Sequence, residues 1–310
     1  MIYLAPDAPP SGSADAGSQA TPAQPFSKPS GSDKYKSQAV DNFPQPYRAG
    51  IFKSTVEFIR KTLVIAELEI YKLRRDPSEL IMRAVQPVLW LVVFGSVFTR
   101  IRAIPTGDLR YIDFLAPGVL AQSVLFVAIF YGISIIMDRE LGIMHKFLVS
   151  PTPRTALVLG KALSAGVRAI AQAVIIYAIC LIVGVKMNYH PLAIAGVLLV
   201  VVLGATLFST FSLIIACIVR TRERFMGIGQ IMTMPLFFAS NAIYPIAIMP
   251  TWLQVISKIN PLTYEVDALR ALMIANGTST YGITADLAML FLMTTLLVII
   301  GGNIYHRIIT

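Results

Sequence analysis

Several long apolar runs constrain this chain more than any other feature of its sequence. Two of them, Leu192–Val219 and Leu287–Ile300, contain no charged residue. A helix that crosses the hydrocarbon core of a bilayer needs about 20 mostly apolar residues, and several runs reach that length. Charged residues make up only 14% of the chain, against about 25% in a soluble domain. The sequence therefore predicts an integral membrane protein.

The runs resolve into six predicted transmembrane helices, so the expected fold class is an all-α membrane protein. Proline and asparagine interrupt the fifth predicted span at Pro235, Asn241 and Pro245. Irregular backbone at that depth is tolerated only where it packs in protein or lines a cavity. The expected spans are Leu80–Thr99, Asp113–Met137, Leu157–Val185, Pro191–Val219, Phe225–Met249 and Thr284–Tyr305.

Lysine and arginine predict the orientation of these spans. Most of the basic residues beside the spans fall on one side, in clusters at 72–75, 139–154 and 220–224. An excess of basic residues marks the cytoplasmic side, so both termini are expected in the cytoplasm. The same topology explains the net charge of +9 without a nucleic-acid partner. Asp113 and Asp286 are expected in solvent at outer span ends, and Arg168 is expected to snorkel to the cytoplasmic surface.

Two segments before the first span have different compositions. Residues 1–46 are rich in Pro, Ser, Ala, Gly and Asp and contain no apolar stretch long enough for a signal peptide, which predicts a disordered cytoplasmic tail. Residues 47–76 carry apolar residues at alternating spacings of four and three, with basic residues on other faces. This pattern predicts an amphipathic helix in the membrane interface. A solvated helix packed on a soluble partner is the alternative.

The cytoplasmic segment 138–154 is more than a simple connector. Prolines at 151 and 153 predict the end of a short helix. A cytoplasmic amphipathic helix suits docking into a groove of a partner protein, or it can lie against lipid headgroups, and both readings stay open. Its apolar face is made of Leu141, Met144, Phe147 and Leu148.

The outer segment 250–277 is too polar to span the membrane and too apolar to be a free loop. Asn260-Pro261 divides it into two helical parts, and Asp267 and Arg270 have the three-residue spacing of a helical ion pair. We expect a re-entrant hairpin that enters the membrane partway. The alternative is a pair of interfacial helices anchored by Trp252.

Two motifs in these segments resemble those of a known family. The cytoplasmic motif reads Asp138-Arg139-Glu140-x-Gly142, then Ser150-Pro151, Arg154 and Val158-Leu159-Gly160-Lys161. The outer motif reads Asn260-Pro261-Leu262-Thr263-Tyr264, then Asp267-Ala268-Leu269-Arg270. Together they resemble the ABC-2 type permeases, the membrane subunits of ATP-driven exporters, and especially the branch of daunorubicin-type drug-resistance permeases. The resemblance runs from about Ile51 to the C-terminus. The chain departs from it at Ile143, Met144 and His145, where family members often carry Thr and then an acidic residue.

The resemblance implies a role for each segment. Residues 47–76 would be a connecting helix, and residues 77–310 the ABC-2 transmembrane domain. The segment around Asp138 would be a coupling helix seated on a separate ABC ATPase subunit. The coupling residues would be Asp138, Arg139, Glu140, Leu141, Gly142, Phe147, Ser150, Pro151 and Arg154. The outer re-entrant gate would use Trp252, Asn260, Pro261, Tyr264, Asp267 and Arg270.

The resemblance also implies partners and a location. Two permease subunits, most simply a homodimer, would face each other among membrane lipids in a bacterial plasma membrane. The only Gly-Lys pair, Gly160-Lys161, has Thr155 where a phosphate-binding loop needs glycine. ATP and Mg²⁺ would therefore belong to the partner ATPase, and no cofactor, metal or catalytic residue is expected on this chain.

Polar residues inside the predicted spans are candidates for the transport pathway, although such residues often only bridge helices. The resemblance favours an amphiphilic small molecule such as a drug or lipid as substrate, with a lipid-linked polysaccharide as the alternative. A membrane-embedded enzyme or an ion-driven secondary transporter are hypotheses of another class. The candidate pathway residues are Gln122, Gln172, Asn241 and Tyr244.

Overall fold

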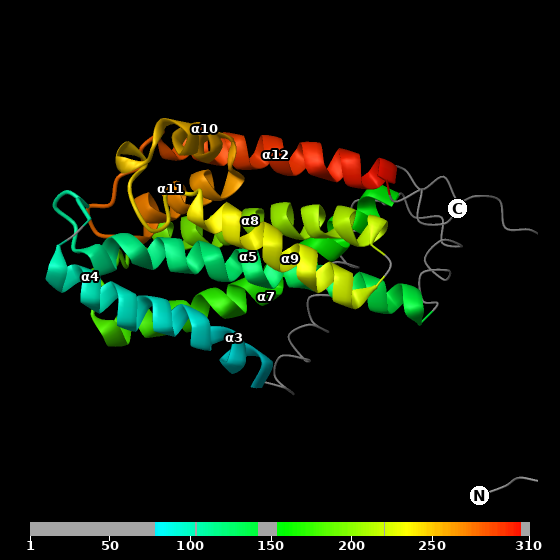
Figure 1. The fold of residues 1–310 in the computed structure, drawn as a ribbon, viewed down its shortest axis with the longest axis horizontal. Coiled ribbons are helices and arrows are strands. Elements are labelled where there is room, and N and C mark those ends of the chain that lie inside the picture. The colour runs from blue at the N-terminus through cyan, green and yellow to red at the C-terminus, as the bar shows by residue number, and fades with distance from the viewer. Residues whose placement is uncertain (1–77, 103, 142–153, 220, 305–310) are drawn as a thin grey trace, which may run out of the picture. The chain divides into compact units, whose positions relative to one another are not determined.

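A computed structural model describes residues 78–102, 104–141, 154–219 and 221–304, and the regular elements in these ranges are all helical (Figure 1). The connecting helix expected at 47–76 and the coupling segment 142–153 lie outside the described residues. The helices are α3 (Ser78–Leu89), the π-helix η1 (Trp90–Phe94), α4 (Gly95–Ile101), α5 (Tyr111–Glu140), α7 (Arg154–Val183), α8 (Pro191–Ile218), α9 (Arg222–Phe238), the 3-10 helix η2 (Ile246–Ile248), α10 (Thr251–Ile259), α11 (Pro261–Met273) and α12 (Ile283–Ile304).

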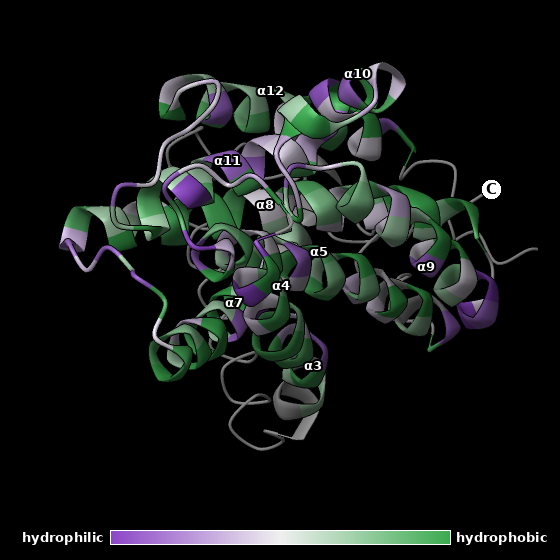
Figure 2. Cartoon of the chain, turned by 60° about the vertical axis from the view of Figure 1, so that its left-hand side comes forward, coloured by the Kyte–Doolittle hydropathy of each residue, from purple (hydrophilic) through white to green (hydrophobic). Residues whose placement is uncertain are grey.

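Five stretches of helix are long and apolar enough to cross a membrane. They overlap the first four predicted spans and the sixth, so the all-helical, multi-pass membrane architecture is confirmed. Polar residues gather near helix ends, for example at the start of α9, while apolar residues cover the lengths of the helices (Figure 2). The five stretches are Ala84–Ile101, Tyr111–Ser134, Ala162–Val183, Pro191–Ile218 and Ile283–Ile304.

The fifth predicted span, Phe225–Met249, is wrong as a continuous helix. The helix α9 has 17 residues and ends at Phe238, before a series of turns and η2. Pro235 lacks an amide donor and restricts the residue before it, which weakens the last turns of α9. Side chains satisfy the carbonyl groups left free there. The Tyr244 hydroxyl donates to the Phe238 carbonyl at 2.6 Å, and Asn260 Nδ2 donates to the Leu236 carbonyl at 2.7 Å.

Although α9 is short, it runs between the two ends of the bundle. At its start, Arg222 pairs with Glu140, the last residue of α5. Just beyond its end, Asn241 meets α11, and Arg270 of α11 lies over Phe114 near the start of α5. The helices α5 and α9 are therefore antiparallel neighbours (Figure 1).

Two helices form the centre of the bundle. The helix α8 packs against α5, α7, α11 and α12. In the candidate spans, 83% of the α5 stretch and 56% of the α8 stretch are buried, against 22% for the first stretch and 17% for the last. The first and last spans therefore present most of their apolar surface outward, as lipid-facing helices do.

Candidate functional site

The carboxylate of Asp267 on α11 is the centre of a polar network at one end of the bundle. It is fully buried and accepts hydrogen bonds from the Ser279 hydroxyl at 3.0 Å and the Thr280 amide at 2.6 Å. It also accepts from the Thr280 hydroxyl, the Tyr281 amide and Asn241 Nδ2. Asp267 thus joins α11 to the turn after α9 and to the loop before α12.

Arg270, one helical turn after Asp267, extends this network to α5. Its Nη1 lies 3.8 Å from Asp267 Oδ1, so the predicted three-residue pair is present at the limit of a salt bridge. Its Nη2 donates to the Asn241 carbonyl at 2.7 Å, and its guanidinium lies 3.8 Å from the ring centre of Phe114. A buried cation held over an aromatic face and by a carbonyl replaces part of its lost hydration. Sequence patterns gave no indication of Phe114 as a partner.

The residues at the start of α11 explain why this helix begins where it does. Asn260 is the N-cap, and its side chain accepts from the Leu262 amide at 3.0 Å. Pro261 occupies the first helical position, where its missing amide costs nothing. The Tyr264 hydroxyl donates to the Lys258 carbonyl at 2.6 Å, which ties α11 back to α10.

The two ends of α11 lie at different depths of the bundle. Pro261 lines an apolar cavity of about 240 Å³ together with Leu207 of α8 and Leu297 of α12. Leu297 is about 21 Å along α12 from its first residue, at 1.5 Å per residue. At the other end of α11, Ile274 forms an isolated bridge with Met187, in the loop between α7 and α8. The segment thus enters the bundle lengthwise, while Trp252 of α10 stays 66% exposed.

The expectation that Asp113 and Asp286 are in solvent is wrong. Asp113 is 1% exposed and pairs with Arg110 at 2.7 Å, and it also accepts from the Lys186 amide. The hydrogen bond from Arg110 to Asp113 raises the pKa of the Arg110 guanidinium above its ordinary value. Asp286 is fully buried, and its Oδ2 lies 2.7 Å from Ser279 Oγ, whose single hydroxyl proton is shared between Asp286 and Asp267. Both carboxylates find partners in loops, which span prediction does not consider.

Glu265 is a buried carboxyl group of a different kind. It is fully buried, and within the described part of the chain neither carboxyl oxygen has a hydrogen-bond partner. It packs against Gly204 of α8, where an added Cβ would lie 2.4 Å from the carboxyl carbon. Burial raises the pKa of Glu265 well above its ordinary value. In the sequence, Glu265 only interrupts an apolar face, and nothing local links it to Gly204.

The opposite end of the bundle carries the first residues of the cytoplasmic motif. Glu140 is half exposed and pairs with Arg222, which joins the end of α5 to the start of α9. Leu141 is exposed. The backbones of Asp138, Arg139 and Arg154 are helical, while their side chains lie outside the described residues. The predicted coupling residues Gly142, Phe147, Ser150 and Pro151 lie outside them as well.

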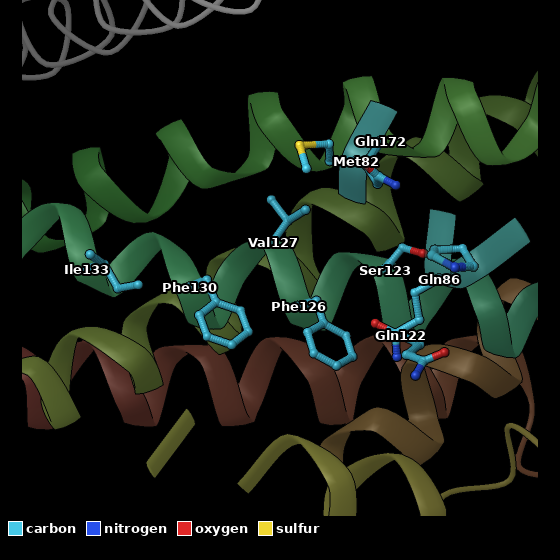
Figure 3. A pocket seen from close by; sticks show the side chains of 10 residues that line it. Met82, Gln86, Gln122, Ser123, Phe126, Val127, Phe130, Ile133 and Gln172 are labelled. Atoms are coloured by element: carbon cyan, nitrogen blue, oxygen red, sulfur yellow. The ribbon is translucent and has the colours of Figure 1, made fainter. Parts of the chain in front are cut away.

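Two of the four candidate pathway residues share a cavity of about 430 Å³ (Figure 3). It lies between α3, α5 and α7, and both Gln122 and Gln172 line it. Asn241 and Tyr244 are not among its lining residues and belong to the turn after α9. Sequence reasoning missed the other side chains along α5 that line this cavity, such as Ser123, because they are individually unremarkable in a span.

Arg168 lies inside the third candidate span, and its guanidinium is 5.4 Å from the ring centre of Tyr131 on α5. This contact gives the cation an aromatic partner within the bundle. Snorkelling of Arg168 stays a prediction. Of the two cysteines, Cys180 is buried and Cys217 is partly buried, and neither forms a disulfide.

Comparison with known proteins decides the family. A family model described as ABC-2 type transporter matches residues 60–274. The chain belongs to the ABC-2 type transporter family. The match extends across both motifs, so the prediction of a membrane subunit of ABC transporters is confirmed.

Several ABC-2 relatives are similar over most of this chain. The putative transport permease ycf38 of Cyanophora paradoxa is 30% identical over 69% of this chain and 74% of its own length. The daunorubicin resistance ABC transporter permease protein DrrB1 of Streptomyces coeruleorubidus is 27% identical over 66% of this chain and 71% of its own. The probable multidrug ABC transporter permease YbhR of Escherichia coli is 30% identical over 55% of this chain and 46% of its own.

Proposed function

We propose that this chain is the membrane-spanning permease subunit of an ATP-driven exporter that moves an amphiphilic small molecule outward. The observation that carries this proposal is the ABC-2 match over residues 60–274, which includes both the cytoplasmic and the outer motif. Relatives named for daunorubicin resistance and multidrug transport support an amphiphilic substrate over a polysaccharide.

The energy source in this proposal is a separate ABC ATPase, which binds ATP and Mg²⁺. Its docking site is the coupling segment that begins at Asp138. The pairing of Glu140 with Arg222 supports this assignment, because a docked subunit that moves the segment would pull on α5 and α9 together. The permease itself binds no nucleotide.

The proposed topology has six crossings with both termini in the cytoplasm of a bacterial cell. The segment from Arg222 to Asn241 provides the crossing that no long helix provides, since its two ends meet opposite ends of α5. The helices α10 and α11 form a re-entrant outer gate, supported by the depth of Pro261 beside Leu297. Two such subunits face each other across the path.

Reconstitution with the presumed ATPase tests the coupling assignment. The variants Glu140→Gln and Gly142→Val should weaken complex formation and lower transport-coupled ATPase activity by about tenfold or more, whereas Asp108→Asn, at the other end of the bundle, should change neither. If both coupling variants retain full activity, the coupling assignment is wrong. Transport that continues after ATP depletion on an imposed ion gradient would instead establish a secondary transporter.

A charge exchange separates the two roles of Glu140. The double variant Glu140→Arg with Arg222→Glu keeps an ion pair between α5 and α9 but removes the carboxylate from α5. Recovery of activity relative to Glu140→Arg alone would mean that Glu140 acts through the ion pair. Continued loss would mean that the ATPase contacts this carboxylate directly.

A further inference from the structure

The hydroxyl group of Ser279 lies between two buried carboxyl groups. Its Oγ atom is 3.0 Å from Asp267 Oδ2 on α11 and 2.7 Å from Asp286 Oδ2 on α12. The amide of Gly282 donates to the same hydroxyl oxygen at 2.6 Å. Both aspartates are fully buried, whereas Ser279 is partly exposed in the loop before α12. The three side chains therefore join α12 to α11 by a chain of contacts that water can reach at Ser279.

This chain has one more contact than the hydroxyl group can fill with a proton. A serine hydroxyl carries one proton and two lone pairs. The Gly282 amide uses one lone pair, and the single proton of Ser279 can be donated to one carboxylate at a time. If both aspartates were ionised, the other oxygen–oxygen contact would have no proton in it, and two like charges would lie on either side of one hydroxyl. One additional proton satisfies every contact, because a carboxylic acid then donates to Ser279 while Ser279 donates to the other carboxylate.

The hydrogen bonds of the two aspartates indicate which of them holds the additional proton. Asp267 accepts from the amides of Thr280 and Tyr281. It also accepts from Asn241 Nδ2, and donors of this kind favour the charged form of a carboxyl group. Among the described residues, Asp286 contacts the serine hydroxyl through Oδ2, and its Oδ1 has no hydrogen-bond partner. The additional proton therefore belongs on Asp286.

The position of Asp286 in the first turn of α12 does not change this assignment. The start of a helix favours a negative charge. That effect is small beside the hydration that a fully buried carboxylate loses when no donor replaces it. A proton on Asp286 removes this loss, because the neutral acid needs less hydration and has a hydrogen-bond acceptor in the serine hydroxyl.

Several charged and titratable groups around Asp286 come from α11 and from the loop before α12. Arg270 Nη1 lies 3.8 Å from Asp267 Oδ1, so its charge compensates Asp267 first. Tyr264 and Tyr281 are close enough to Asp286 for an electrostatic interaction. Both are neutral at moderate pH, because tyrosine ordinarily ionises near pH 10.

The other helices packed on α12 add few titratable groups. The helix α8 carries no Asp, Glu, His, Lys, Arg or Tyr along its length, and the last two turns of α7 carry Tyr177 and Cys180. Glu265, the other buried acid of α11, faces α8. Asp267 is thus the charged group that meets Asp286 through a shared partner, and its negative charge favours a proton on Asp286.

We propose that Asp286, Ser279 and Asp267 form a proton-binding site that fastens the loop before α12 to α11. With the proton bound, Asp286 donates to Ser279 and Ser279 donates to Asp267. When the proton leaves to water at high pH, Ser279 serves one carboxylate alone, and the repulsion between the two aspartates loosens the loop. The site goes beyond the export function, and only its exposure to the pH outside the cell rests on the proposed topology.

Infrared spectroscopy of the full-length chain in lipid nanodiscs tests for the proton directly. A protonated carboxylic acid has a carbonyl stretch at a frequency where a carboxylate and an amide have none. Asp286→Asn should remove one such band at pH 5, and in the wild type the same band should weaken as the pH rises to 9. The matched control is Glu265→Gln, which removes another fully buried acid and should leave this band in place. A spectrum in which Asp286→Asn removes no acid band, or a band that stays constant up to pH 9, would overturn the proposal.

Hydrogen exchange of the loop amides tests whether the proton fastens the loop. After correction for the intrinsic pH dependence of exchange, protection of the Thr280 and Tyr281 amides in the wild type should fall about tenfold between pH 5 and pH 9. The side-chain amide of the Asp286→Asn variant can donate to Ser279 at any pH, so its protection should stay constant. Asp108→Asn, at an exposed loop position, should behave as the wild type does.

Two results of the exchange measurement would contradict the proposal. One is the same pH dependence in the wild type and in Asp286→Asn. The other is protection that depends on sodium at constant pH, measured in sodium chloride against choline chloride, since the two aspartates would then hold a metal cation in place of a proton. Because these measurements need neither ATP nor an ATPase, either result would leave the export function in place.

Discussion

The buried acidic residues of α11 differ in how their charge is compensated. Asp267 accepts hydrogen bonds from two separate segments, the turn after α9 and the loop before α12, and Arg270 lies beside it. Glu265, two residues earlier, has no hydrogen-bond partner for either carboxyl oxygen among the residues that the structure describes. Neighbouring carboxyl groups on one helix thus have opposite environments, and burial without a partner favours the neutral form of Glu265.

Removing the carboxylate of Asp267 should therefore destabilise the protein. Asp267→Ala leaves Arg270 buried without its anion and frees the amides of Thr280 and Tyr281, a loss of roughly 3–5 kcal/mol. The thermal unfolding midpoint in detergent should fall by about 6 °C or more. Asp108→Ala, at an exposed loop position, is the control and should shift it little. An unchanged midpoint for Asp267→Ala would show that the network contributes no net stability.

Glu265→Gln should stabilise the protein, in contrast to Asp267→Ala, and the size of this stabilisation should depend on pH. The pKa of Glu265 is higher in the folded protein than in the unfolded chain. Below the unfolded pKa of about 4.3, the carboxyl group is protonated in both states and does not lower the free energy of unfolding. As pH rises from there through the folded pKa, the wild type loses stability that the amide variant keeps, about 1.4 kcal/mol for each unit of pKa difference. Thermal unfolding at pH 5 and pH 8 measures this. The advantage of the variant should be larger at pH 8, and a constant difference would contradict a neutral Glu265.

At the scale of helices, the sequence predicts what depends on local pattern. The apolar runs identify five spans because length and hydropathy are local properties, and Asn260-Pro261 correctly marks a helix start because capping is local too. The break in α9 was visible in its prolines, yet the side chains that stabilise it come from elsewhere. The environments of Asp113 and Glu265 depend on loops and on Gly204, which are distant in sequence. Contacts between residues so far apart in the sequence cannot be predicted from local patterns in a single sequence.

One close helix contact gives an element-scale prediction. Gly118 of α5 touches the turn after α9, and an added Cβ would lie 2.5 Å from the backbone oxygen of Ala242. Backbone cannot rotate away, so Gly118→Ala should destabilise the protein by about 1–3 kcal/mol. Gly166→Ala on α7 is the matched control, since its Cβ would meet Val202 at an ordinary 3.4 Å. The comparison is made by thermal unfolding, and equal midpoints for the two variants would contradict the tight α5 contact.

For the whole molecule, the testable quantity is the side of the membrane on which each end of the bundle lies. In a background with Cys180→Ala and Cys217→Ala, single cysteines at exposed positions 108 and 278 should react with an impermeant maleimide added outside intact cells. A cysteine at position 223 should react only after permeabilisation. Labelling of positions 223 and 278 from the same side would mean that α9 does not complete a crossing.

The uneven packing of the bundle has a consequence for how a solute reaches its interior. At one end, Asp267 and Arg270 bind α5, α11, the turn after α9 and the loop before α12 into one unit. The first span is mostly exposed, yet α3 supplies Met82, Gln86 and Pro87 to the wall of the large cavity. A change in the tilt of α3 would open the cavity on this side without breaking any of the hydrogen bonds of Asp267 and Arg270 named above. A molecule already dissolved among the acyl chains could then enter sideways, so its partitioning into lipid would govern the rate of uptake.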